Sequence, residues 1–285
     1  MWMISNSFIS SKMKRFLIYA LFLSCLASCT AERVPHRTDV GTISVTLAAE
    51  TGSQTQTKAL TVLTPEQAAG YTIGIYNENG TRARYNDTDQ EIGDAPYSSF
   101  ETVEVALYQS YYVTAYSCTP EEAEQANGGK GGPRFEGRSG VFTLNASNIS
   151  ENARVECSQT NAKVTVVFDG TVAGRFSDLK VALKSGSREL TVKESDGTTV
   201  LYFNPAGMTY SISGTYKATD DLGGLGSVGV SLSGSQTLVA KDNYRLVIKL
   251  NMEYGKADVP SIEVDEVFCN EDEVSGTFDP YDYEN

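Results

Sequence analysis

Apolar and polar side chains alternate in short segments along most of the chain. The first segment is GTISVTLAA (41–49), in which Ile43, Val45 and Leu47 fall on one side and the polar residues between them on the other. A period of two residues predicts a β-strand with one buried face. We therefore expect a chain that is built from many short strands.

Further segments of this kind continue to residue 268, and residues that favour turns separate most of them. Two of the turns, at Asn79-Gly80 and Asp196-Gly197, have residue pairs that favour tight hairpins. Many short strands at this spacing predict β-sandwiches or β-barrels. The segments are 71–80, 100–107, 111–117, 140–144, 153–157, 161–170, 179–186, 188–195, 198–203, 209–218, 226–233, 236–240, 243–251 and 261–268.

Helical signals are few and short. At 64–68, Thr64 is a good N-cap and Pro65 suits the first helical position. A second short helix is expected at 121–126. The polar segment 52–58 and the glycine-rich segment 127–133 are expected to be loops.

The length of 285 residues is enough for about two domains of ordinary size. Hydrophobic residues make up 40% of the chain and charged residues 21%, so the composition allows real cores. We place a boundary near residue 159, because only four residues separate the strand that ends in Cys157 from the strand that begins at Ala162. The prediction is an all-β protein with two abutting β-sandwiches, at 41–159 and 160–268, and an acidic tail at 269–285.

The first 28 residues have the layout of a secretory signal peptide. Lys12, Lys14 and Arg15 form a basic start, and the apolar run at 16–27 follows them. A helix that spans a hydrocarbon core needs about 20 residues, so this run is too short to stay in the membrane as a span. Met13 lies next to the basic residues and is an alternative start of translation.

The signal ends in LASC (26–29), which resembles the lipobox of bacterial lipoproteins. The resemblance implies cleavage before Cys29 and acylation of that cysteine, with palmitate among the acyl chains. Cys25 fits the pattern less well, because the bulky Leu23 precedes it. The alternative interpretation is an ordinary signal peptide with an incidental cysteine.

Several acyl chains on Cys29 would hold the protein stably on a membrane. Thr30 stands where an aspartate would retain a lipoprotein in the inner membrane, which indicates the outer membrane. Residues 29–40 are then a lipidated tether. We expect the cell surface rather than the periplasmic face. The signal for export to the surface resembles an acidic cluster close behind the cysteine, and residues 30–33 carry only one acidic residue, so this expectation is weaker than that of lipidation.

The net charge of the chain is −13. Without the first 28 residues, 20 basic and 36 acidic residues remain, which gives a net charge of −16. A chain this acidic repels nucleic acid and anionic lipid headgroups, so we exclude nucleic acid as a partner. Contact with the membrane is expected through the acyl chains alone.

The layout of segments resembles a family of Bacteroidetes outer-membrane lipoproteins of unknown function that are related to the fimbrillins. The resemblance rests on the lipobox and on GTISVTL, YTIGIYNENG, YYVTAYS, PRFEG (133–137), VECSQTNAKVTVVFDG (155–170) and YRLVIKLN. It covers most of residues 41–268, and VECSQTNAKVTVVF is its most specific part. It implies two tandem β-sandwiches of transthyretin-like or immunoglobulin-like type and a role in cell adhesion, with no catalytic residues to carry over.

Catalysis has little support in the sequence. The single histidine, His36, lies in the tether, which excludes Ser-His-Asp and Cys-His catalysis and histidine-based zinc sites. A glycosidase needs only a pair of carboxylates, but with 36 acidic residues the sequence identifies no such pair, and we expect no enzyme and no cofactor. Of the cysteines after the signal, Cys118 and Cys157 are a candidate disulfide in an oxidising compartment, and the alternative is a pair of buried free thiols.

The remaining candidate sites are weak. Asp87, Asp89 and Glu91 have the spacing of calcium ligands, but Ile92 occupies the place of the expected glycine, and a solvated acidic turn is the simpler interpretation. Strand tyrosines such as Tyr71, Tyr108 and Tyr112 could bind a glycan or could be core residues.

The predicted function is a non-catalytic surface structural or adhesion role, as a fimbrial component or anchor that self-associates through sheet edges. The tail at 269–285 is a candidate for such pairing, and a mobile acidic tail is the alternative. The second hypothesis for the whole chain is a glycan-binding lipoprotein of a polysaccharide-uptake system.

Overall fold

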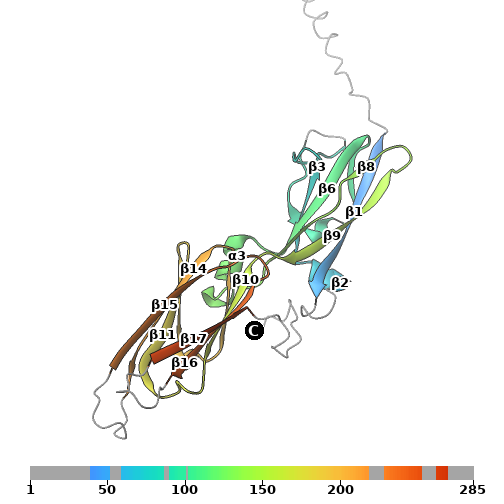
Figure 1. The fold of residues 1–285 in the computed structure, drawn as a ribbon. Helices are drawn as coiled ribbons and strands as arrows, with labels where there is room; N and C mark the ends of the chain where they lie inside the picture. The colour runs from blue at the N-terminus through green and yellow to red at the C-terminus, as the bar shows by residue number, and fades with distance from the viewer. Residues whose placement is uncertain are drawn as a thin grey trace, which may run out of the picture. The chain divides into compact units, whose positions relative to one another are not determined.

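The structure is a computed structural model. It describes residues 39–51, 59–86, 90–100, 102–217, 228–251 and 261–268. Within these ranges the chain is built almost entirely from β-strands, with short helical turns between them (Figure 1), so the predicted all-β sandwich fold is confirmed. In the same ranges, no helix is both long enough and apolar enough to cross a membrane.

The first nine strands form one mixed sheet that surrounds a single core. In its centre, β1 pairs with β9 in parallel over Thr42–Ala49, while β5 and β2 pair with successive parts of the opposite edge of β1. The strands are β1 (Val40–Thr51), β2 (Ala59–Val62), β3 (Thr72–Asn77), β4 (Ala95–Pro96), β5 (Val103–Ala106), β6 (Gln109–Tyr116), β7 (Phe135–Arg138), β8 (Phe142–Leu144) and β9 (Ser150–Gln159).

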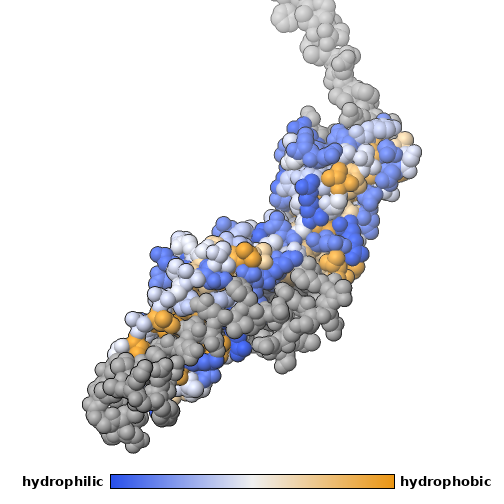
Figure 2. All heavy atoms as spheres, viewed as in Figure 1, coloured by the Kyte–Doolittle hydropathy of each residue, from blue (hydrophilic) through white to orange (hydrophobic). Residues whose placement is uncertain are grey.

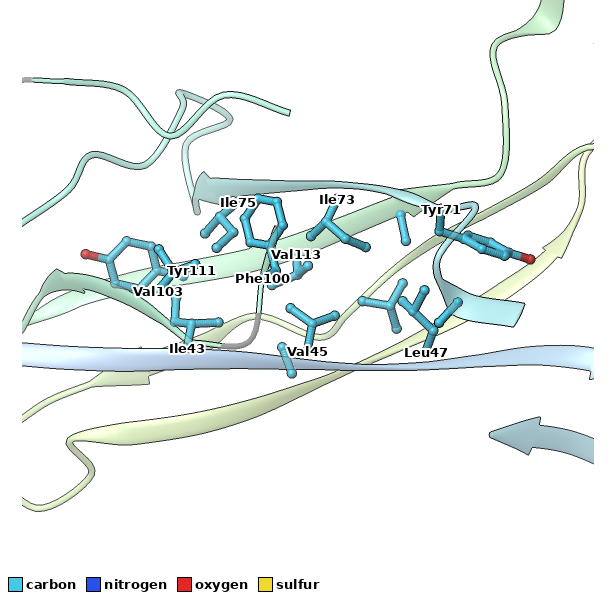
Figure 3. Close-up of a cluster of buried hydrophobic side chains, with 14 of the residues drawn as sticks. Ile43, Val45, Leu47, Tyr71, Ile73, Ile75, Phe100, Val103, Tyr111 and Val113 are labelled. Carbon is cyan, nitrogen blue, oxygen red and sulfur yellow. The ribbon is translucent and has the colours of Figure 1, made fainter. Parts of the chain in front are cut away.

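The core of this sheet contains the apolar positions that the alternation predicted. Figure 3 shows Ile43, Val45 and Leu47 of β1 projecting toward Ile73 and Ile75 of β3. Four of these five side chains are less than 2% exposed, and Val45 is 6% exposed. Because burying one such side chain contributes about 1.5–3 kcal/mol, this two-sided packing is a main source of stability.

The last eight strands form two four-stranded sheets that enclose a second core. One sheet has the order β13-β10-β16-β17, with β10 and β16 parallel, and the other has the antiparallel order β12-β11-β14-β15. The strands are β10 (Ala162–Phe168), β11 (Phe176–Ser185), β12 (Arg188–Lys193), β13 (Thr199–Phe203), β14 (Gly207–Tyr216), β15 (Val228–Thr237), β16 (Asn243–Asn251) and β17 (Ser261–Phe268).

The two core clusters have no residue in common: one is drawn from residues 43–157 and the other from residues 162–248. They lie on the two sides of residue 159, where the sequence placed a boundary. Whether 41–159 and 160–268 are independent domains stays a prediction, because separate cores do not by themselves show separate folding.

Both predicted helices are present. Helix α2 (Pro65–Ala68) and helix α3 (Pro120–Gln125) each begin with proline after a threonine N-cap. In each case the threonine hydroxyl accepts a hydrogen bond from the backbone N–H three residues on, and a Gln or Glu side chain there completes a capping box. Short 3-10 turns follow strand β4, helix α3 and strand β12: η1 (Tyr97–Ser99), η2 (Asn127–Gly129) and η3 (Glu194–Asp196).

Two details of the sequence prediction are wrong. The turn at Asp196-Gly197 does not close a hairpin, because β12 pairs with β11 and β13 pairs with β10 in the other sheet. Gly197 has a positive φ of 64°, so the chain does turn here as the sequence predicts. The predicted pairing of the two flanking strands is what is wrong. The segment 236–240 is not a separate strand either, because β15 runs through to Thr237.

Helix α3 and the loop after it are hydrogen-bonded to strands β12 and β13. The guanidinium of Arg188 donates from Nη2 to the carbonyl oxygens of Gly129, at 2.6 Å, and Glu124, at 3.1 Å, and from Nη1 to that of Tyr202. The backbone N–H of Tyr202 in turn donates to the carbonyl of Lys130 at 3.0 Å. Burial lowers the pKa of Arg188, and nearby Glu124 partly offsets this effect.

Candidate functional site

Four side chains form a continuous row on the outer face of β3, β6 and β7. Tyr76 and Tyr112 are directly opposite each other on β3 and β6, and their rings are stacked with centroids 5.3 Å apart and planes 10° apart. The guanidinium of Arg82 lies 4.5 Å from the ring centre of Tyr76, and that of Arg138 lies 3.5 Å from the ring centre of Tyr112. We call these four residues the tyrosine–arginine row.

The local backbone explains why the row can form. A bridge places Arg82 opposite Tyr76, and Arg138 pairs with Thr114, which puts it diagonal to Tyr112. Gly74 lies two residues before Tyr76 on β3, on the same face. A Cβ atom at Gly74 would collide with the carboxylate of Asp94, so the absence of a side chain leaves room for Asp94 beside the row.

Asp94 fixes one end of the row. Its two carboxylate oxygens accept hydrogen bonds from the two terminal nitrogens of Arg82, so the guanidinium is held in a bidentate pair. This hydrogen bonding raises the pKa of Arg82. The pKa of Tyr76 is also raised, first by burial and then by the charge of Asp94. Both groups therefore keep their protons throughout the physiological range.

The row suits protein recognition better than sugar stacking. The faces of both rings are already covered, because each ring lies between its partner ring and a guanidinium. A sugar that needs an open aromatic face would have to displace an arginine. Tyrosine and arginine are enriched at the centres of protein–protein interfaces, and a prestacked row loses little side-chain entropy on binding.

A second feature is a polar trough on the outer face of β11, β12, β14 and β15. It has a volume of about 520 Å³. Its floor and walls combine small hydroxyl side chains with one ammonium and one carboxylate group. The lining residues are Ala182, Lys184, Glu189, Thr209, Tyr210, Ser211, Ser233, Gly234 and Ser235.

The predicted site residues are placed as follows. Cys29 lies outside the described residues, as do Asp87 and Asp89, so the lipidation and calcium hypotheses stay predictions. Glu91, the third calcium candidate, is exposed and forms an isolated bridge with Arg84. Among the described residues, no group of three or more His, Cys, Asp or Glu side chains is close enough to hold a metal ion.

The candidate disulfide between Cys118 and Cys157 is not formed, and both residues are free thiols. Gly137 of β7 pairs with Ala115 on one side and with Cys157 on the other, so β7 lies between Cys157 and β6, the strand that Cys118 follows. The alternative of free thiols is therefore what the structure contains.

Burial raises the pKa of both thiols. Cys157 is completely buried in the first core, and burial raises the pKa of its thiol to about 12. Cys118 is half-buried, and burial is also the main cause that raises its pKa. The thiolate is the reactive form of cysteine, so burial makes both residues less reactive than a free cysteine near neutral pH.

The sequence predicted only part of the tyrosine–arginine row. Of the three strand tyrosines, Tyr112 belongs to the row, whereas Tyr71 is buried in the core and Tyr108 is 64% exposed outside the row. Tyr76, Arg82, Asp94 and Arg138 were not predicted. The alternation places Tyr76 and Tyr112 on outward positions, but nothing in the sequence shows that they are neighbours.

Comparison with known proteins gives one family match. Residues 39–277 match DUF4493, which is described as a domain of unknown function. The comparison with curated proteins finds no match.

Solved structures with a similar chain course include three fimbrial proteins. The fimbrial anchor protein Mfa2 from Porphyromonas gingivalis is 13% identical, with a TM-score of 0.38, over 80% of this chain and 98% of that one. The tip fimbrial protein Mfa3 from the same organism is 11% identical, with a TM-score of 0.39, over 81% and 99%. A fimbrial assembly protein from Parabacteroides distasonis is 11% identical, with a TM-score of 0.37, over 80% and 99%.

Proposed function

The chain belongs to the DUF4493 family of domains of unknown function, and on this premise we propose that it is a non-catalytic outer-membrane lipoprotein with a surface structural or adhesive role. Its attachment would be through acyl chains on Cys29. Its partner would be another protein, such as a neighbouring subunit of a fimbria, for which this chain is a component or the anchor.

The observation that carries this proposal is the tyrosine–arginine row. Its stacked rings and bidentate ion pair hold it in one arrangement. Figure 2 shows that hydrophobic residues on the visible face form small separate patches among hydrophilic ones. Recognition by such a surface depends on a few aromatic and arginine anchors rather than on a broad apolar area.

Variants of the row test the protein-binding role. Tyr112→Ala and Arg138→Ala are expected to weaken binding of the chain to its cellular partner at least about tenfold, because each removes an anchor that the other supports. Tyr108→Ala is the matched control, since Tyr108 is exposed on the same domain but outside the row. Equal binding by all three variants would show that the row is not the interface.

Anchoring is tested separately. Cys29→Ser should abolish the incorporation of labelled palmitate and move the protein from the membrane fraction to the soluble fraction, whereas Cys25→Ser should do neither. Protease treatment of intact cells then distinguishes the cell surface from the periplasmic face. Loss of palmitate from the Cys25 variant alone would overturn the assignment of Cys29.

The second candidate role is a glycan-binding lipoprotein of a polysaccharide-uptake system. The polar trough of about 520 Å³ favours it, since hydroxyl, ammonium and carboxylate groups together match the groups of a sugar. Ladders of polymers on a mildly denaturing gel would support the fimbrial role. Genes for glycoside hydrolases and a transporter next to this gene would support the second role.

A further inference from the structure

The outer face that contains the trough has an unusual grid of side chains. Strands β11, β14 and β15 pair so that Ala182, Ser211 and Ser233 form one row across the sheet. Side chains in such a row are about 4.8 Å apart, and successive rows are about 7 Å apart. Two rows flank this one: Glu189, Lys184, Thr209 and Ser235 on one side, and Lys193, Lys180, Ser213 and Ser231 on the other.

Small side chains make this face hollow. Ala182, Ser211 and Ser233 rise little above the backbone, whereas Lys184 and Glu189 at one end are long. The ring of Tyr210 passes beneath Gly234, where a Cβ atom would collide with it, and Tyr210 itself is only 5% exposed. The trough therefore offers hydroxyl groups and charges to a ligand, and its lining offers no open aromatic face.

The charge on this face opposes that of the chain as a whole. Strands β11 and β12 hold three exposed lysines against two exposed acidic residues, Asp178 and Glu189, although the whole chain has a net charge of −13. Glu189 faces Lys184 as an opposite-charge pair. Asp196, at the end of β12, accepts a hydrogen bond from the backbone N–H of Lys193 at 2.8 Å.

Lys180 and Lys193 are direct cross-strand partners, and both are exposed. Like charges in this position destabilise a sheet. A bound anion between the two ammonium groups would remove the repulsion, so the pair has the properties of an anion site rather than of a stabilising contact.

We propose that this face binds an acidic polysaccharide, with carboxylate or sulfate groups at Lys180 and Lys193 and sugar hydroxyls along the trough beside Ser211 and Ser233. The ligand class follows from the combination of groups. The lysine pair attracts an anion, the row of hydroxyls can hydrogen-bond to a ligand with many polar groups, and the open trough admits a chain that enters and leaves across the sheet. This inference rests on the second proposed role, a glycan-binding lipoprotein, and names the class of glycan.

The test uses the full chain and measures binding to polygalacturonate and to dextran sulfate, with neutral dextran as the reference polymer. The intact chain should bind at least one of the two acidic polymers and should not bind dextran. The two acidic polymers distinguish a preference for carboxylate from one for sulfate. Binding to neither acidic polymer would overturn the proposal.

The variant K193E gives the sharpest outcome. It replaces a like-charge pair by an opposite-charge pair, so we expect a higher midpoint of thermal unfolding together with at least about tenfold weaker binding of the acidic polymer. A variant that merely damaged the fold would lower both the midpoint of thermal unfolding and the affinity for the polymer. Ser211→Tyr should also weaken binding, because it fills the trough without a change of charge. The control K130E makes the same charge change at an exposed lysine just after η2, outside the strands that form this face, and should bind normally.

Three outcomes would contradict the proposal. Equal weakening by K130E, or equally tight binding of polyglutamate, would show a general attraction for anions. A change of self-association in Ser211→Tyr with unchanged polymer binding would show that a second copy of the chain covers this face. Tyr112→Ala separates this proposal from the protein-binding role, because it should weaken partner binding and leave polymer binding intact.

Discussion

At Gly137 the backbone of β7 passes so close to β9 that no side chain fits between them. A Cβ atom at this position would collide with the carbonyl oxygen of Glu156 and lie 2.7 Å from its carbonyl carbon. The neighbouring atoms belong to the backbone of a paired strand, so they cannot turn away as a flexible side chain could.

We therefore predict that Gly137→Ala lowers the free energy of unfolding by about 1–3 kcal/mol, as overpacking does elsewhere. Gly140→Ala is the control, since nothing lies within 4 Å of its Cβ position, and it should change stability by about 0.5 kcal/mol or less. Urea denaturation followed by circular dichroism measures both. Equal midpoints for the two variants would contradict the close approach of β7 and β9.

Thiol reactivity is the second prediction for single residues. In the native protein at pH 8, iodoacetamide should modify Cys118 before Cys157, because Cys157 is buried and its pKa is raised to about 12. In urea, where burial is lost, the two rates should converge. Peptide mass spectrometry resolves the two sites, and a Cys157 that reacts as fast as Cys118 in the native state would contradict its burial.

Among the elements, helix α3 shows how a locally determined segment acquires a distant role. Its sequence contains a complete N-terminal cap, but the helix has only six residues, too few to be stable alone. Its stability depends on Arg188, whose guanidinium donates to the carbonyls of Glu124 and Gly129. Gly131 follows with a φ of 91°, and a Cβ atom there would lie 2.7 Å from the carbonyl oxygen of Tyr202.

We predict that Arg188→Ala loosens this segment. The substitution leaves three carbonyl groups without their donor, which costs about 1–3 kcal/mol for each buried group that water cannot reach. Backbone amides of residues 119–134 should exchange faster with deuterium, while those of β3 and β6 should not. Arg188→Lys should rescue only part of the protection, because an ammonium lacks the planar fork of a guanidinium. Arg175→Ala, an exposed arginine in the same region of the sequence, is the control.

At the scale of the whole molecule, the two separate cores make a prediction about folding. If the boundary near residue 159 is correct, chains of residues 40–159 and 160–285 should each unfold cooperatively, since each retains a complete core cluster. Each should be less stable than the same region in the intact chain, because the hydrogen bonds of Arg188 and Tyr202 to the α3 segment are lost. Near-ultraviolet circular dichroism during urea titration measures both effects, and a part that stays unfolded would place the boundary elsewhere.

Local signals predicted most of the elements correctly. The alternation of Ile43, Val45 and Leu47 indicates β1, and the Thr-Pro pairs indicate α2 and α3. Each of these signals is formed by residues that are only a few positions apart. The prediction of a hairpin at Asp196-Gly197 is wrong because it, too, used only neighbouring residues. A turn sequence fixes the backbone of a few residues, and the sheet that the next strand joins is decided by packing.

The sequence by itself determined that the chain is all-β, where most strands lie, and that its amino terminus resembles a lipoprotein signal. Each of these properties depends on residues that are adjacent or alternate along the chain. The tertiary structure alone decided that β1 pairs in parallel with β9, that Arg138 meets Tyr112, and that Lys180 faces Lys193. These contacts join residues between 13 and 108 positions apart, and only the burial of a shared core brings such distant residues together.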